Sequence, residues 1–552
     1  MALDRRAFLE SLGAGTAATV TLGALGLTLP GRAAAAPAGS AIGPTTGPAA
    51  GPQTPEERRL AALQMRQDMA QLAFDRPLAA HVDNGDEAAY PTRFANYSKG
   101  LPHDANGVVE PAAYDALLAA VASGSAADFE AIQMGLGRKL TNPQAGLAFD
   151  LEGPDAQHHS IPPAPAFASA EEAAEMGELY WMALTRDISF TEFETSRQAA
   201  AAGADLSSFS DFRGPKEGSQ VTPGTLFRGV TPGDLAGPYI SQFLLRDFAY
   251  GSLVISHRQE TVPAGLDHLT DYDAWLFVQN GGLPGPERIE QQRRYIRNGR
   301  DLAHYVHVDA LYEAYLNACL ILLGMGAPVD SGNPYAGSGN QIGFGTFGGP
   351  HILSLVTEVA TRALKAIWFQ KWFVHRRLRP EEFGGRVHNH LAGTVGHPVH
   401  EDLLSSRALP EVRRRFGSWL LPTAFPEGCP THPSYGSGHA TVAGACVTIL
   451  KAWFDESWVI PDPVVPNQAG TSLVRYSGHD AGSLTVGGEL NKVAANIATG
   501  RNMAGIHWRS DFVESVILGE SIAIGVLEEQ KATYNEAGSF SLTRFDGTTI
   551  TI

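Results

Sequence analysis

Apolar residues recur at intervals of three and four positions over long stretches of this chain, which is the spacing of one buried helix face. The pattern is strongest at residues 168–190, 351–377, 441–453, 487–499 and 510–529. The alternation typical of strands is rare, and we predict a short hairpin or tail at residues 539–552. The pattern therefore predicts an all-α protein whose helices are joined by long loops.

Weaker helical patterns complete the predicted helices. They cover residues 58–74, 111–123, 126–136, 239–249, 287–298, 302–324 and 410–420. Thr54 and Pro55 form a helix start with two acidic residues behind them, and Pro380 disfavours helix at Arg379 and so ends the 351–377 helix. Segments rich in turn residues are predicted as loops: 75–107, 141–165, 205–236, 263–282 and 328–349.

The first residues have the pattern of an export signal. Arg5 and Arg6 are followed by Phe8 and Leu9, as at the start of a bacterial twin-arginine signal. A mildly apolar stretch at 12–29 and small residues at 33–36 follow, so we expect residues 1–36 to be the signal and 37–53 a disordered linker. A membrane anchor is the alternative. Export by this route implies a periplasmic or secreted protein.

The composition of the chain argues against some classes of binding partner. The chain has 552 residues, 58 acidic and 41 basic side chains, and a net charge of −17, which argues against a nucleic-acid partner. Three cysteines are too few for a disulfide scaffold. The later sequence has no apolar run of the ~18 residues that span a bilayer, so no membrane span is expected in the mature chain.

The stretch 430–441 is a polar turn that continues into an apolar helix. Ser437 lies near the predicted N-cap, where unpaired backbone N–H groups suit an anion, and Gly438 lets the backbone approach that anion closely. His439 follows directly. Taken alone, this stretch is explained equally well as a capped helix with a chance histidine.

Two further stretches decide between these interpretations. Lys371 and Arg379 lie eight positions apart in the segment 371–380, and Arg501 and His507 lie in the segment 500–511. Together with the Ser-Gly-His stretch they resemble the three-part signature of vanadium-dependent haloperoxidases. Type 2 phosphatidic acid phosphatases and bacterial acid phosphatases share it in looser form. The spacing of eight is similar to that of the algal-type bromoperoxidases, and the resemblance covers most of the chain from about Phe227 onward.

The resemblance implies a fold, a cofactor and roles for particular residues. The fold would be two four-helix bundles in a single helical catalytic domain, residues 54–552, with the active site in its C-terminal half at about 350–530. The cofactor would be vanadate, one per subunit; the sequence offers no support for calcium. Its oxygens would be bound by Lys371, Arg379, Ser437, Gly438 and Arg501. His507 would be the metal ligand, His439 the acid–base group, Lys371 a catalytic cation, and His432 a residue that tunes halide preference.

Elementary chemistry agrees with this set, because a buried oxyanion needs cations and hydrogen-bond donors from several elements. Arg501 and His507 are six positions apart with Gly505 between them, so a helix break is expected there. Asp511 would either orient His507 or cap a helix, and His432 has the alternative of a solvated turn histidine. His375, Arg376 and Arg377 are predicted to be structural or surface residues. The cluster His388, His390, His397 and His400 matches no standard zinc spacing and is expected in a loop.

The resemblance implies an enzyme that oxidises bromide or iodide with hydrogen peroxide to hypohalous acid, which halogenates small organic acceptors. An exported acid phosphatase that forms a phosphohistidine at His507 is the alternative. A non-enzymatic oxyanion-binding protein is a third possibility, which two histidines and three cations in one signature disfavour. The family also implies a homo-oligomer.

Overall fold

The computed structural model describes residues 54–552, so the predicted export signal and the predicted linker lie outside the described residues. Its strands are paired in three antiparallel hairpins of two strands each, and helices account for the other regular elements of this part of the chain. The hairpins are β1 (Phe248–Tyr250) with β2 (Leu253–Ile255), β3 (Val464–Pro466) with β4 (Leu473–Arg475), and β5 (Ser541–Thr543) with β6 (Thr549–Thr551). The all-α prediction and the C-terminal hairpin are confirmed.

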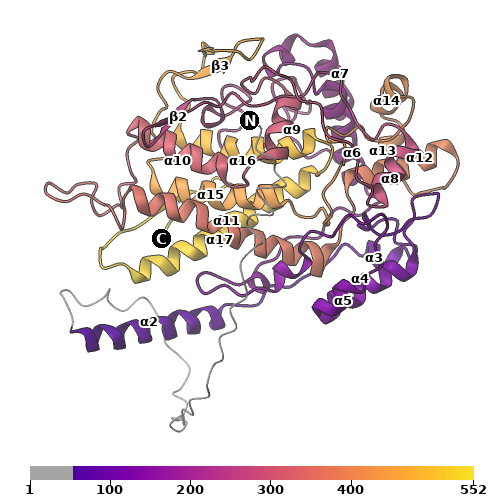
Figure 1. The fold of residues 1–552 in the computed structure, drawn as a ribbon. Coiled ribbons are helices and arrows are strands. Elements are labelled where there is room, and N and C mark those ends of the chain that lie inside the picture. Colours follow the sequence, from indigo (N-terminus) through magenta and orange to yellow (C-terminus); the bar gives the residue numbers. More distant parts are fainter. Residues whose placement is uncertain (1–53) are drawn as a thin grey trace, which may run out of the picture. The chain divides into compact units, whose positions relative to one another are not determined.

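The helices follow one another along the chain with long connections (Figure 1). They are α2 (Pro55–Asp75), α3 (Asp86–Ala89), α4 (Pro111–Ser123), α5 (Ala126–Glu130), α6 (Ala170–Thr185), α7 (Arg197–Leu206), α8 (Tyr272–Gln279), α9 (Gly299–Val308), α10 (Glu313–Met325), α11 (Gly349–Phe369), α12 (Pro380–Ala392), α13 (Glu401–Leu404), α14 (Ala408–Phe416), α15 (Gly438–Trp453), α16 (Val486–Met503) and α17 (Arg509–Thr533). Short 3-10 helices are η1 (Pro143–Leu147), η2 (Ala156–His158), η3 (Phe190–Thr195) and η4 (Gln242–Leu244), and η5 (Gln370–His375) is a π-helical turn.

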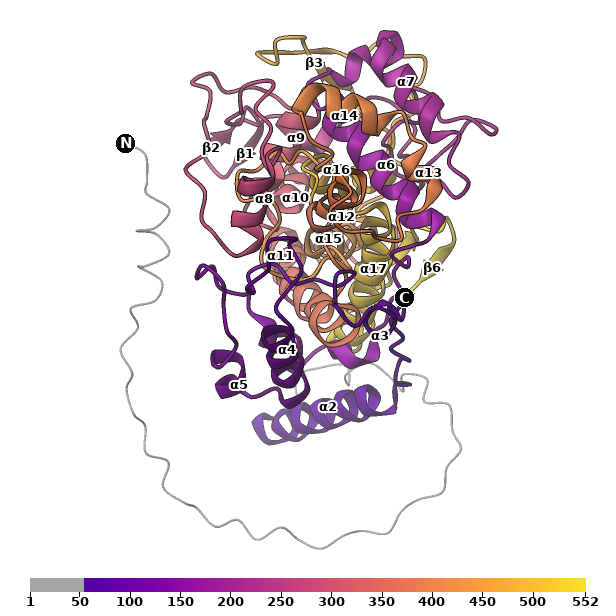
Figure 2. The ribbon, with the colours of Figure 1, turned by 90° about the vertical axis from the view of Figure 1, so that its right-hand side faces the viewer.

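Helix α15 is the centre of the C-terminal bundle and packs against α11, α16 and α17 (Figures 1 and 2). Every residue of α15 except His439 is buried. Two glycines bring α15 and α17 into close contact: a Cβ at Gly444 would lie 2.2 Å from the Val516 carbonyl oxygen, and one at Gly519 would lie 2.1 Å from that of Thr441. Larger side chains there would force the helices apart. Helices α7, α13 and α14 pack against α6 as a second group.

Two predicted helices are absent from the described chain. Residues 239–249 form only the turn η4 and then β1, because the backbone N–H of Ser241 donates to Asn496 and that of Gln242 to Glu489, both at 2.8 Å. Residues 287–298 are extended, since Glu290 and Arg294 donate their backbone N–H groups to the carbonyls of Thr261 and Gln259. Long-range partners have replaced the helical hydrogen bonds in both segments.

Other boundaries also differ from the prediction. The helix predicted at 302–324 is broken into α9 and α10, which are bent by 101°. Helix α5 ends at Glu130 rather than at 136, and α7, α8 and α12 lie where no helix was predicted. Pro380 starts α12 as well as ending the preceding helical segment, because its fixed φ suits a first helical position.

Helix α2 lies on the outside of the described chain and has no buried residue (Figure 2). It begins as predicted, with Thr54 and Glu57 forming a reciprocal capping box. Among residues 54–552, no single helix has the length and hydropathy to span a membrane, although α9 and α10 meet that test when taken as one bent pair.

Candidate active site

The three signature stretches meet in the C-terminal bundle. Lys371 lies in the π-helical turn after α11, Arg379 is the N-cap of α12, and both side chains are fully buried. Arg501 comes from the last turn of α16, and His507 from the turn between α16 and α17. That turn contains Gly505 at φ 79°, so the predicted break between Arg501 and His507 is confirmed.

Lys371 and Arg379 are held by the turn that precedes α15. Lys371 Nζ donates to the carbonyls of Pro433 and Ser434 at 2.8 and 2.9 Å, which uses two of its three N–H groups. Arg379 Nε donates to the carbonyl of His432 at 2.9 Å, and its Nη2 lies 2.9 Å from His432 Nδ1. His432 therefore fixes the guanidinium plane of Arg379.

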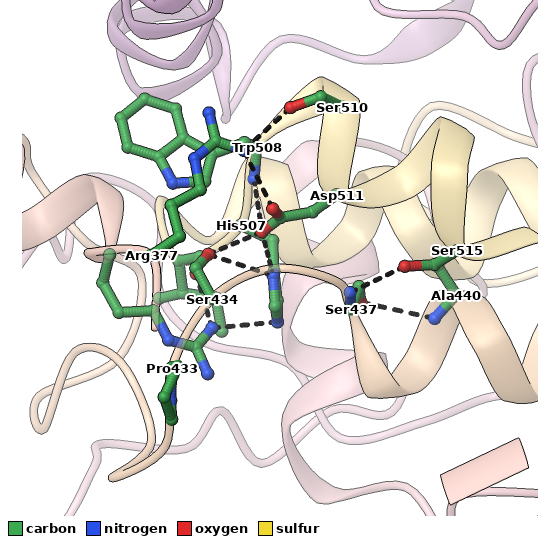
Figure 3. A network of polar contacts seen from close by, with 12 residues as sticks. Arg377, Pro433, Ser434, Ser437, Ala440, His507, Trp508, Ser510, Asp511 and Ser515 are labelled. Carbon is green, nitrogen blue, oxygen red and sulfur yellow. Dashed lines mark hydrogen bonds and ion pairs between the residues drawn. The ribbon is translucent and has the colours of Figure 1, made fainter. Parts of the chain in front are cut away.

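His507 is oriented by Asp511, four residues later on the first turn of α17. His507 Nδ1 lies 2.5 Å from Asp511 Oδ2, so the N–H is on Nδ1 and the lone pair is on Nε2 (Figure 3). Asp511 also accepts from the backbone N–H of Trp508 at 3.3 Å. It therefore performs both of the alternative roles predicted for it. The Nε2 lone pair accepts an N–H from Arg379 Nη1 at 2.9 Å.

Ser434 and Arg377 complete the support around Asp511. The Ser434 hydroxyl donates to Asp511 Oδ2 at 2.5 Å, and Arg377 Nη1 is 3.0 Å from Asp511 Oδ1 (Figure 3). Arg377 also pairs with Glu172 and Glu175 of α6. It is buried, so the structural interpretation holds for this arginine and the surface interpretation is wrong. Ser434 was not identified from the sequence, because a serine in a turn carries no distinguishing pattern.

Ser437 and Gly438 form the predicted helix start. The Ser437 hydroxyl oxygen accepts the Ala440 N–H at 3.3 Å, and the Ser437 N–H donates to the Ser515 hydroxyl at 2.8 Å (Figure 3). The hydroxyl proton of Ser437 remains available to a ligand. A Cβ at Gly438 would lie 3.0 Å from the Trp368 ring, so only glycine leaves the backbone this accessible without displacing the ring.

His439 is paired with Asp309, which sequence analysis missed. His439 Nε2 lies 3.1 Å from Asp309 Oδ1, and Asp309 occupies the break between α9 and α10 that the sequence predicted as continuous helix. Burial alone would raise the pKa of Asp309, but His439 and Arg501 bring it below its ordinary value. Because residues 302–324 were predicted as one helix, the sequence offered no signal that placed Asp309 beside His439.

The pocket is strongly positive. Burial and the neighbouring Arg379 hold the pKa of Lys371 well below its ordinary value, and burial lowers the pKa of Arg501 to about 10. The pKa of His507 and that of His432 are both held well below the usual value, first by burial and then by Arg379. An anion bound among these basic groups would stabilise their charged forms and so raise their pKa values.

The donors fit a small oxyanion such as vanadate. Lys371 keeps one N–H, Ser437 keeps its hydroxyl proton, and Arg501 Nε is buried without a partner among the described residues. Arg501 Nη1 donates to the Val306 carbonyl, which fixes this guanidinium to α9. A tetrahedral anion next to His507 Nε2 would satisfy these donors and offset the buried positive charge.

The four clustered histidines do not form a group of three or more metal-ligand atoms in the described part of the chain. His388 and His390 belong to α12, so the predicted loop is wrong for them. His388 Nδ1 accepts the Trp419 N–H, His390 Nδ1 accepts the His397 N–H, and His400 caps α13.

A helical bundle with a buried cationic pocket and an oriented imidazole defines a class of oxyanion-binding helical proteins. The family model described as "VCPO second helical-bundle domain" matches residues 413–536, which include Ser437, Arg501 and His507. The vanadium-dependent bromoperoxidase of Corallina officinalis is 41% identical, with 90% of this chain and 99% of that protein covered. That of Ascophyllum nodosum is 37% identical over 83% of this chain and 86% of its own length.

A solved structure agrees with these relatives. The homohexameric second vanadate-dependent bromoperoxidase from Ascophyllum nodosum superposes with a TM-score of 0.85 at 31% identity, covering 90% of this chain and 91% of that one. The chain belongs to the vanadium-dependent bromoperoxidase family.

Proposed function

We propose that this protein is a vanadium-dependent haloperoxidase that oxidises bromide or iodide with hydrogen peroxide and releases hypohalous acid to organic acceptors. The observation that carries the proposal is the meeting of three buried cations, Lys371, Arg379 and Arg501, near His507, whose Nε2 lone pair faces Arg379. When bound, vanadate supplies a Lewis-acid centre that activates hydrogen peroxide and keeps its oxidation state. The balanced reaction consumes one halide, one peroxide and one proton, and yields hypohalous acid and water.

Each residue of the pocket would have its own role in binding vanadate. His507 would bind the metal through Nε2, because Asp511 keeps the proton on Nδ1. The Arg379 N–H that Nε2 now accepts would then turn to an oxygen of the anion. Ser437, Gly438 and Arg501 would bind further oxygens through the hydroxyl, the backbone N–H and the guanidinium.

His439 and Lys371 are suited to proton and charge transfer. Asp309 holds His439 at Nε2, which leaves Nδ1 to take or give a proton. Lys371 would place its remaining N–H on bound peroxide and polarise it. His432 would contribute to halide preference, and its two contacts to Arg379 add a positioning role.

The test separates this function from the acid phosphatase alternative, since phosphate and vanadate present similar oxygens to the same donors. The protein is dialysed against phosphate and then titrated with vanadate. Peroxide-dependent bromination should fall in phosphate and return with vanadate, and His507→Ala should neither retain vanadium nor recover activity. Vigorous phosphatase turnover inhibited by vanadate, with no halide oxidation at any pH, would overturn the proposal.

We also propose that the protein is exported by the twin-arginine route and that it forms a homo-oligomer. Arg5 and Arg6 support export, and they lie outside the described residues. Assembly is supported by the exposed apolar residues of α2, among them Leu63 at 54% and Phe74 at 81% exposure. The homohexameric relative from Ascophyllum nodosum has a similar fold.

A further inference from the structure

A second group of ligand-type side chains lies outside the oxyanion pocket. Glu287, in the extended segment before α9, faces His304 and His307 of that helix. Each contributes one ligand atom, and the three atoms lie within 4.8 Å of one another. The two histidines are three positions apart, so they lie on one face of α9.

Two of the three separations match those between neighbouring ligands of a small metal ion. Glu287 Oε2 is 3.5 Å from His304 Nδ1 and 3.3 Å from His307 Nδ1. In a tetrahedral zinc site, with bonds of about 2.0–2.2 Å, two ligand atoms are separated by roughly 3.4 Å.

Several atoms of the group have no hydrogen-bond partner in the described part of the chain. His304 is only 3% exposed, yet both of its ring nitrogens are unpartnered, as is His307 Nδ1. Buried polar atoms are nearly always satisfied, so the unbonded Nδ1 atoms of His304 and His307, which both face Glu287 Oε2, indicate a ligand between them.

Glu427 supplies the outer contact that a metal-binding histidine requires. His307 Nε2 lies 2.7 Å from Glu427 Oε1, so Nε2 carries a proton, and Nδ1 faces Glu287 Oε2 at 3.3 Å. A metal ion would take the place of any proton on Nδ1. A carboxylate behind the ring is the usual partner of a histidine that binds metal. It orients the imidazole and raises its basicity.

An ion could reach the group from solvent. His304 also lines an open cavity of about 420 Å³, whose other walls include the β1–β2 hairpin and α10. Metal entry needs such a path, because the other ligands are buried or partly buried.

We propose that Glu287, His304 and His307 bind one divalent transition-metal ion of the zinc class, in addition to vanadate. Two imidazoles, which lose any second ring proton when they bind a metal, and one carboxylate suit zinc, with a fourth position for water. This site does not depend on the function proposed for the oxyanion pocket.

The bound ion would also stabilise the side of the oxyanion pocket that is formed by Arg501. Val306, between the two histidines, accepts a hydrogen bond from Arg501 through its carbonyl. The His307 ring stacks on Phe425 at 3.7 Å, and the Arg501 guanidinium lies 5.6 Å from the same Phe425 ring. Fixing His304 and His307 therefore fixes the last turn of α9 against Arg501.

The first test measures zinc retained by the vanadate-loaded full chain. The protein is dialysed against micromolar zinc chloride and then against metal-free buffer, and zinc and vanadium per chain are measured by mass spectrometry. We expect one zinc per wild-type chain, and at least tenfold weaker zinc binding by Glu287→Gln and by His304→Gln. His479→Gln, at an exposed position, and Glu411→Gln, whose side chain is half-exposed, are the matched controls and should bind like the wild type.

The melting temperature of each variant without zinc shows whether it folds, and zinc should raise it only in the wild type and the controls. Cobalt(II) added to wild-type protein tests the site without any substitution: a four-coordinate visible spectrum that one equivalent of zinc removes is expected. The proposal is overturned if the wild type retains no zinc and gives no such spectrum. Zinc binding by Glu287→Gln and His304→Gln that equals the controls would also overturn it, since zinc would then be adventitious.

Discussion

At the scale of single residues, the candidate site depends on which nitrogen of each histidine carries the proton. Asp511 fixes that proton on Nδ1 of His507, Asp309 pairs with Nε2 of His439, and Glu427 pairs with Nε2 of His307. In each case a buried or partly buried carboxylate decides which lone pair is left for chemistry. The proposed chemistry therefore depends on these three carboxylates as much as on the histidines that they orient.

Asp511→Asn should weaken vanadate binding by about 10–100-fold. The amide keeps the shape of the side chain, but it removes the charge that holds the proton on His507 Nδ1. The vanadate concentration that restores half of the bromination activity measures the effect. Asp546→Asn, at an exposed loop position, is the control. Unchanged vanadate affinity in Asp511→Asn would show that Asp511 only caps α17.

Because His375 is buried, we predict that the folded protein loses stability as the pH falls. Burial, and then the charge of Arg376, lowers its pKa from 6.5 to about 3, and neither ring nitrogen has a partner among residues 54–552. The unfolded chain therefore binds a proton that the folded chain excludes between pH 6.5 and 3. The stability contribution is complete above pH 6.5 and is lost as the pH falls, by up to about 1.4 kcal/mol per pH unit.

His375→Phe keeps an aromatic ring beside Tyr435 and cannot titrate. Its melting temperature should fall less than that of the wild type between pH 6.5 and 4.5. Parallel curves for the two proteins would contradict a buried neutral His375.

At the scale of elements, buried charge joins helices that are far apart in the sequence. Arg377, just after the π-helical turn, pairs with Glu172 and Glu175 of α6 and with Asp511 of α17. Its guanidinium also lies 4.7 Å from the Trp508 ring. The ion pairs of Arg377 therefore connect α6 to the first turn of α17, where Asp511 orients His507.

Arg377→Ala should destabilise the protein by about 3–5 kcal/mol, because three buried carboxylates would lose their cation. Thermal denaturation of the vanadate-loaded protein measures the effect. Arg414→Ala removes an exposed pair with Glu411 and should cost no more than about 1 kcal/mol. Equal melting temperatures for the two variants would mean that the Arg377 network contributes little to stability.

At the scale of the whole molecule, the described chain begins with an exposed helix that carries several apolar side chains. Leu60, Leu63 and Phe74 of α2 are all more than half exposed. Burying such side chains would contribute about 25 cal/mol for each Å² removed from water. A second copy of the chain is therefore the occupant we expect for α2.

Leu63→Glu combined with Phe74→Glu should reduce the oligomer mass measured by light scattering at micromolar concentration, while bromination persists. Val254→Glu in β2 places the same charge on another exposed apolar residue and serves as the control. A wild-type monomer would refute the homo-oligomer, and an unchanged mass in the double variant would exclude α2 from the interface.

Export makes a separate prediction at this scale. Replacing Arg5 and Arg6 by lysine should leave the protein in the cytoplasm, because the twin-arginine receptor distinguishes the two cations. Fractionation of expressing cells gives the answer. Protein that still reaches the periplasm would show that another signal directs it.

The sequence by itself determined the fold class and the chemistry of the pocket. Helical periodicity is a local property, so α11, α15, α16 and α17 were predicted close to their observed positions. The cations, the glycine and the histidines of the signature could be named because together they resemble the signature of vanadium-dependent haloperoxidases. The bonds of Asp511 and the break at Gly505 also follow from local spacing.

Only the tertiary structure decided which distant groups meet. Asp309 pairs with His439 because the helix predicted at 302–324 breaks and turns by 101°. Segments 239–249 and 287–298 are not helical because distant side chains and carbonyls satisfy their backbone N–H groups. Glu287, His304 and Glu427 come together in the same way. Such contacts depend on three-dimensional packing, whereas the hydrophobic pattern records only which face of each segment is buried.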